Sequence, residues 1–89
     1  MVNIRRSEID IIGEILNLSR DGAKKTEILY QGNLSYTQLQ KYLPFLVEKD
    51  ILEENVVNSG NGSSCKLYEI TEKGSSLLED IRKVLAHLG

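Results

Sequence analysis

The fold is decided by residues 35–49, SYTQLQKYLPFLVEK, which carry the clearest helix signal of the chain. Ser35 and Gln38 form a capping box, in which a hydroxyl and a carboxamide three residues apart satisfy free amides at a helix start. Apolar residues then recur at helical spacing on one face. They are Leu39, Leu43 and Leu46, flanked by Tyr42 and Val47. The opposite face holds Thr37, Lys41, Pro44 and Glu48. The stretch therefore predicts an amphipathic helix with one face turned to solvent or a ligand.

Two helices are predicted before this stretch. The first opens with the capping-box-like pair Ser7 and Asp10 and ends at Asp21-Gly22, where glycine can take the left-handed conformation. Its apolar residues form two stripes, which suggests neighbours on two sides. The core stripe is Ile9, Ile12, Ile15 and Leu16, and the second is Ile4, Ile11 and Leu18. A short helix follows from about Lys24 to Gln31, and we expect Gly32 to allow a tight turn before Leu34.

A hairpin and a last helix are predicted after it. Two β-prone stretches flank the turn-forming run 58–64, which predicts a hairpin over residues 51–70 with a long tip. Thr71 is suited to cap a helix over residues 72–88, although Gly74 weakens its first turn by about 1 kcal/mol relative to Ala. Its apolar stripe is Leu77, Leu78, Ile81, Val84, Leu85 and Leu88. We expect a single, mostly α domain over residues 1–89, with a small β-hairpin and the order helix-helix-helix-strand-strand-helix.

Composition limits the function. The chain has 89 residues, 27% of them charged, and a net charge of −2, which argues against a protein that coats polyanions generally. One cysteine (Cys65) and one histidine (His87) cannot form a disulfide framework or a usual metal site, and Cys65 has no evident catalytic base. No apolar stretch approaches the ~20 residues of a membrane span, and no leader opens the chain. We therefore expect a non-enzymatic cytoplasmic protein that uses no cofactor, metal, membrane or evident small-molecule ligand.

The element order is that of a winged helix-turn-helix, which presents its second motif helix to the major groove of double-stranded DNA. Charge agrees with this interpretation, because residues 22–41 contain three lysines and one glutamate, a net of +2 in an otherwise acidic chain. As a set, Lys24, Lys25 and Lys41 are interpreted as phosphate contacts, although each alone is more typical of a solubilising charge. Thr37, Gln38 and Gln40 are candidates to contact base edges. The other candidate contacts are Ser35 and Tyr36 at the helix start, with Asn61 and Lys66 in the hairpin.

The sequence also resembles a known family. The segments Gly22–Tyr30 and Asn33–Tyr36, with Leu39, Tyr42-Leu43, Phe45-Leu46 and Thr71–Gly74, are similar to small archaeal winged helix-turn-helix proteins over about residues 5–88. That family contains predicted transcriptional regulators and dimeric chromosomal DNA-binding proteins with coiled-coil C-terminal helices. The resemblance implies a DNA-binding homodimer. The sequence departs from the family's pattern at two points. Pro44 lies inside the recognition helix, and the sequence stops at Gly89, too early for the long C-terminal coiled coil of the family.

Three questions stay open at this stage. Leu77, Ile81, Val84 and Leu88 follow the 4-3-4 spacing of a heptad seam, and a complementary strip of a dimer could come from Ile4, Ile11 and Leu18. The alternative is that both stripes pack on each other within one chain. The second question is whether the domain binds a protein partner rather than DNA, which the Glu53-Glu54 pair and the acidic C-terminal half favour. The third is whether DNA binding is sequence-selective or a general coating.

Overall fold

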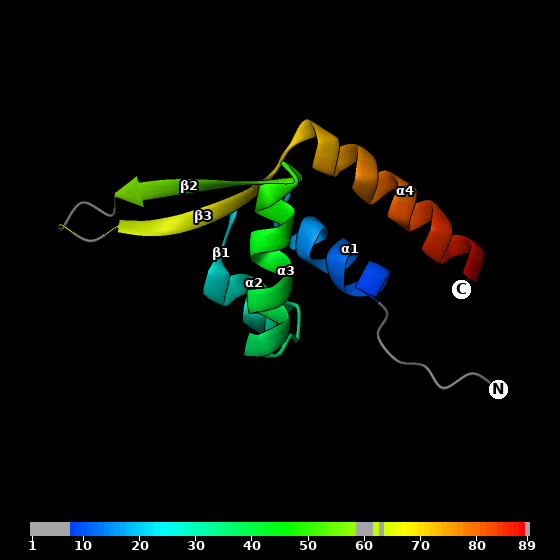
Figure 1. Cartoon of the computed structure of the whole chain (residues 1–89), viewed down its shortest axis with the longest axis horizontal. Helices are drawn as coiled ribbons and strands as arrows, with labels where there is room; N and C mark the ends of the chain where they lie inside the picture. Colours follow the sequence, from blue (N-terminus) through cyan, green and yellow to red (C-terminus); the bar gives the residue numbers. More distant parts are fainter. Residues whose placement is uncertain (1–7, 59–61, 63, 89) are drawn as a thin grey trace.

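The computed structural model describes residues 8–58, 62 and 64–88, with the side chain of Leu88 outside that description. Four helices and a small antiparallel sheet follow one another in the order α1, β1, α2, α3, β2, β3 and α4 (Figure 1). The helices are Glu8–Leu18, Lys25–Gln31, Tyr36–Glu48 and Glu72–Leu88. The strands are Ala23–Lys24, Leu52–Asn58 and Ser64–Ile70. The mostly helical winged helix-turn-helix fold predicted from the sequence is confirmed.

The sheet contains one strand more than predicted. β1, of two residues, pairs with β3 through Ala23 opposite Tyr68 and Lys24 opposite Leu67. β3 also pairs with β2 along its whole length, from Leu52 opposite Ile70 to Asn58 opposite Ser64, so the strand order is β1-β3-β2. Two residues are too short for any alternation of polar and apolar side chains, and this explains why the sequence pattern did not reveal β1.

One apolar core lies where the helices meet the root of the hairpin, and in Figure 1 the rest of β2 and β3 projects away from the helices on the side opposite α4. Every helix and each of the three strands contributes to this core. Its most completely buried apolar side chains are Ile15, Leu16, Ile28, Leu39, Leu46 and Leu52. The face of α3 predicted to be buried is buried, and α3 continues through Pro44, which is exposed. The core thus fixes α3 by one face only.

The structure corrects the two apolar stripes predicted for the first helix, α1. Ile9, in the first turn of α1, is 46% exposed, whereas Ile15 and Leu16 of the later turns are fully buried. Ile11 is only 3% exposed and belongs to the core of this chain. The prediction of apolar neighbours on two sides is confirmed, since α1 contacts both α2 and α4. Ile11 is therefore an internal packing residue and does not offer a surface for a dimer.

The turn between α2 and α3 also differs in detail from the prediction. Gly22 adopts the predicted left-handed conformation with φ of 89°, but Gly32 has an ordinary φ of −80°. The left-handed residue of the turn is Asn33, with φ of 52°, a conformation that asparagine tolerates better than most residues. Gly32 is needed for space instead, because a Cβ there would lie 2.7 Å from the carbonyl oxygen of Ile28.

Candidate nucleic-acid interface

The start of α3 is fixed by the capping box that the sequence predicts. The Ser35 hydroxyl accepts a hydrogen bond from the Gln38 amide at 3.1 Å, and Gln38 Oε1 accepts one from the Ser35 amide at 3.0 Å. Both side chains are thereby engaged with the backbone, and Gln38 is half-buried. Ser35 and Gln38 position the helix, and Gln38 keeps only its Nε2 group for an outside partner.

The solvent face of α3 is uncovered by the rest of the described chain. At about 100° per residue, six exposed side chains follow one another around this face. They are Tyr36, Gln40, Pro44, Thr37, Glu48 and Lys41. The polar groups that can donate hydrogen bonds lie in the first two turns, whereas Glu48 lies in the last turn. The N-terminal half of α3 is therefore the part whose chemistry suits a polyanion.

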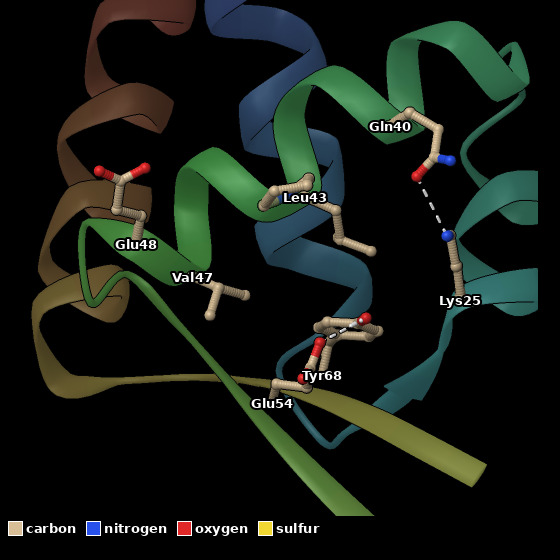
Figure 2. Close-up of a pocket in the computed structure, with 8 residues that line it drawn as sticks. Lys25, Gln40, Leu43, Val47, Glu48, Glu54 and Tyr68 are labelled. Atoms are coloured by element: carbon tan, nitrogen blue, oxygen red, sulfur yellow. Dashed lines mark hydrogen bonds between the residues drawn. The ribbon is translucent and has the colours of Figure 1, made fainter.

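Three side chains from two helices form a bonded unit at the edge of this face nearest the hairpin. Lys25 Nζ, from the first residue of α2, donates to Gln40 Oε1 at 3.2 Å, as Figure 2 shows. Gln40 Nε2 in turn donates to the Tyr36 hydroxyl at 2.9 Å, one helical turn earlier. The Lys25 ammonium also lies 5.5 Å from the centre of the Tyr36 ring, a cation–π distance. We call Lys25, Gln40 and Tyr36 the relay.

The opposite edge of the face carries a different contact. Lys41 Nζ lies 3.1 Å from Glu8 Oε1 of α1 and 5.2 Å from the centre of the Tyr42 ring. The Tyr42 hydroxyl donates to the same Glu8 oxygen at 3.2 Å. Hydrogen bonds from Lys41 and then Tyr42 lower the pKa of Glu8, and the hydrogen bond to Glu8 raises the pKa of Lys41. Lys41 is exposed to solvent, but its ammonium already forms an ion pair with the Glu8 carboxylate of the same chain.

The hairpin presents a second internal pair. Lys66 Nζ of β3 lies 3.7 Å from Glu54 Oε1 of β2, and the Tyr68 hydroxyl donates to Glu54 Oε2 at 2.8 Å. Burial, together with the hydrogen bond to Glu54, raises the pKa of Tyr68 to about 12. Lys24 differs from Lys41 and Lys66, because no carboxylate of residues 8–58, 62 and 64–88 forms an ion pair with its ammonium. Asn61, the predicted contact of the hairpin tip, lies outside the described residues.

The comparisons with known proteins agree with this arrangement. The family model described as winged helix-turn-helix matches residues 5–88. The chain belongs to this family. An uncharacterised protein of Methanocaldococcus jannaschii is 30% identical to this winged helix over 78 residues, which are 86% of the present chain and 71% of that protein. The resemblance to small archaeal winged helix proteins inferred from the sequence is thus confirmed.

Two solved structures are similar to this winged helix. Sso10a-2, a DNA-binding protein from Sulfolobus solfataricus, is 31% identical, with a TM-score of 0.76 over 91% of the present chain and 80% of its own. A PadR-like transcription factor from Bacteroides fragilis is 26% identical, with a TM-score of 0.70 over 88% of the present chain and 81% of its own.

The winged helix has a hollow of about 280 Å³ between α3 and the hairpin. Its lining combines apolar side chains of α3, such as Leu43 and Val47, with Tyr68 and the carboxylate of Glu54 (Figure 2). Within the described part of the chain, no three His, Cys, Asp or Glu side chains gather as metal ligands, and no helix has the length and apolarity to cross a membrane. Two residues of the relay, Lys25 and Gln40, also line this hollow.

Helix α4 is only partly covered by α1. Ile81 is 7% exposed, and its Cγ2 lies 3.0 Å from the position that a Cβ on Gly13 would occupy. Ile81 is thus covered within this chain, as Ile11 is, and for these two residues the structure agrees with the alternative that the stripes of α1 and α4 pack on each other. Leu18 and Leu77 are half-buried, and Val84 is 44% exposed. The apolar stripe of α4 therefore extends beyond the part that α1 covers.

Proposed function

We propose that this winged helix binds double-stranded DNA and regulates transcription, with α3 in the major groove and the β2–β3 hairpin as the wing. The observation that carries the proposal is the uncovered N-terminal half of α3, where hydrogen-bond donors lie between Lys25 on one edge and Lys41 on the other. Recognition helices contact bases mainly through their N-terminal residues. The similarity to Sso10a-2, described as a DNA-binding protein, and to a PadR-like transcription factor supports the same function. The cytoplasmic location expected from the sequence is part of this proposal.

The individual contacts follow from charge and exposure. Lys24 and Lys25 are assigned to phosphates, because neither forms an ion pair within the described residues. Thr37 and Gln40 are assigned to base edges, and Tyr36 to the relay that supports Gln40. Lys41 and Lys66 each lie beside a carboxylate of the same chain, which repels a phosphate and offsets part of the lysine's attraction, so we assign them a smaller contribution to affinity. Ser35 and Gln38 contribute chiefly by fixing the helix start.

Binding as a homodimer is part of the proposal. On a helical projection at about 100° per residue, Leu77 and Val84 form a stripe beside the residues that face α1, namely Leu78, Ile81 and Leu85, while the side chain of Leu88, the last residue of the predicted seam, lies outside the described part of the chain. A second copy of α4 packing on this stripe would bury Val84, and a two-fold axis would present two copies of α3. The half-sites would then lie about 34–36 Å apart. Val84→Glu is expected to produce a monomer in light scattering, whereas the matched charge change Lys83→Ala on the polar side of α4 should leave the oligomeric state unchanged.

The test of DNA binding is fluorescence anisotropy with a labelled duplex of mixed sequence at several salt concentrations. If each protomer neutralises two phosphates through Lys24 and Lys25, the logarithm of the affinity should fall with the logarithm of salt with a slope of roughly −3 to −4 per dimer. Lys24→Glu should weaken binding and flatten this slope. Lys83→Glu makes the same charge change on α4 and should change binding little. Binding that Lys24→Glu leaves untouched would remove the assignment.

A protein partner is the alternative, and one surface favours it. Ile9 and Phe45 are 46% and 43% exposed, and Phe45 borders a groove of about 250 Å³ that also contains Ile12 and Tyr42. Exposed apolar side chains around a groove are typical of protein-interaction sites. The same anisotropy titration distinguishes the two functions, because a protein-interaction module would show no salt-dependent binding to duplex DNA at micromolar protein concentration.

A further inference from the structure

The orientation of the Gln40 carboxamide is dictated by its neighbours. Lys25 has an ammonium that can only donate hydrogen bonds, so the group 3.2 Å away must be the oxygen of Gln40. The amino group of Gln40 must then face the Tyr36 hydroxyl, 2.9 Å away. The opposite orientation would place two donors against each other. The relay therefore has a single consistent bonding direction, from Lys25 to Gln40 and from Gln40 to Tyr36.

This direction determines which groups remain for an outside ligand. The Tyr36 hydroxyl accepts from Gln40, so it keeps its own proton to donate. Gln40 Nε2 keeps one N–H, and Lys25 keeps two. The Gln40 oxygen already accepts from Lys25 and is turned toward α2. In contrast to a free glutamine, which offers an acceptor and a donor together, the relay offers outward donors almost exclusively.

The base edges in the major groove differ in how they match such a surface. Guanine presents two adjacent acceptors, N7 and O6, whereas adenine pairs an acceptor with a donor and cytosine presents a donor. We propose that the relay of Lys25, Gln40 and Tyr36 selects guanine at one position of the DNA site, contrary to the preference for adenine expected of a free glutamine. This inference rests on the proposed DNA-binding function and adds to it the base that the relay recognises.

The relay is also suited to selectivity because it is held before binding. Tyr36 and Gln40 are exposed, so their free donors are accessible, while the buried Leu39 and Leu43 fix the helix between and beneath them. The Lys25 ammonium is held both by Gln40 and over the Tyr36 ring. Side chains ordered in advance lose less conformational freedom on binding, so more of their interaction with the base is retained as affinity.

The inference can be tested by selecting bound duplexes from a randomised pool. Enriched duplexes should share a guanine in each half-site. Replacing it by 7-deazaguanine, which lacks the N7 acceptor, should weaken binding about tenfold, whereas inosine, which keeps N7 and O6, should bind as guanine does. Tyr36→Phe should reduce the preference for guanine, because it removes one outward donor and leaves the ring beside Lys25.

The decisive variant is Gln40→Glu. A carboxylate still accepts from Lys25 but also accepts from Tyr36, so the surface changes from donor to acceptor and the preferred base should change from guanine to cytosine. Gln31→Glu, at the exposed end of α2, makes the same charge change away from the relay and should keep the guanine preference. Both variants should retain the unfolding midpoint of the parent in urea.

The outcomes separate the two proposals. If the parent protein binds the pool but shows no guanine preference, or if Gln40→Glu keeps the parental preference, this inference is overturned while DNA binding stands. If the parent protein binds no duplex even at low salt, the proposed function fails, and the inference fails with it.

Discussion

Gly74 lies in the first turn of α4, where helix propensity and tertiary packing favour opposite residues. Alanine is the better helix former by about 1 kcal/mol, so propensity alone predicts that Gly74→Ala stabilises the protein. A Cβ at this position, however, would overlap the carbonyl oxygen of Ile51 and lie 2.8 Å from Cγ1 of Ile70. Neither group can move easily, because the Ile51 carbonyl accepts the Thr71 amide at 3.1 Å and Ile70 lies at the end of β3.

The two effects differ enough in size to decide the sign. Forcing an extra methyl group into a packed site costs about 1–3 kcal/mol, and overlap with an anchored backbone carbonyl belongs at the upper end of that range. After the gain in propensity, Gly74→Ala should lower the free energy of unfolding by about 2 kcal/mol. For a chain of this size, that corresponds to a decrease in Tm of roughly 8–16 °C.

The assay is urea unfolding followed by circular dichroism, with all proteins at one concentration because a dimer would make stability concentration-dependent. Ser76→Ala, at an exposed position two residues along α4, is the matched control and should stabilise the protein by a few tenths of a kcal/mol. A Gly74→Ala protein with a midpoint equal to or above that of the parent, at the same denaturant slope, would refute the packing argument.

Three further predictions follow from the contacts around the candidate interface. Ser35→Ala removes the hydroxyl that caps α3 and should lower the free energy of unfolding by about 1 kcal/mol in the same urea assay. Glu8→Gln releases Lys41 and should raise duplex affinity a few-fold in anisotropy titrations; unchanged affinity would show that Lys41 makes no contact with DNA. Because the pKa of Glu8 lies below its ordinary 4.5, the link to Lys41 stabilises the fold fully above that pH and is lost as the pH falls below it, so the variant should show a flatter acid profile. Tyr68, with a pKa near 12 against an ordinary 10.0, should ionise late in an ultraviolet titration, and stability should fall as the pH rises from 10.0 toward 12; Tyr68→Phe should abolish the late step.

The elements that the sequence predicted well are those with local signals. The capping box at Ser35, the periodic apolar face of α3 and the last helix after Thr71 each depend on residues a few positions apart. The observed bounds of the two longest helices, Tyr36–Glu48 for α3 and Glu72–Leu88 for α4, therefore differ little from the predicted bounds. The interior Pro44 did not change this outcome, because it lies on the exposed face.

The features that the sequence did not reveal depend on contacts distant in the chain. Helical spacing could not show that Ile9, in the first turn of α1, stays exposed, or that Ile11 and Ile81 are buried in this chain, where α1 packs on α4. The candidate site has the same limitation. The positive charges of Lys25 and Lys41 are visible in the sequence, but their hydrogen-bond partners are 15 and 33 residues away, and no local pattern joins them.

The two-residue strand β1 has a mechanical consequence. Through β1, the backbone of Ala23 and Lys24 is hydrogen-bonded to the middle of β3, directly before the first turn of α2. The lysines at the entrance to α2 therefore cannot shift independently of the hairpin. A bend of the hairpin would move that entrance with it, so this backbone pairing keeps the distance between α2 and the hairpin constant.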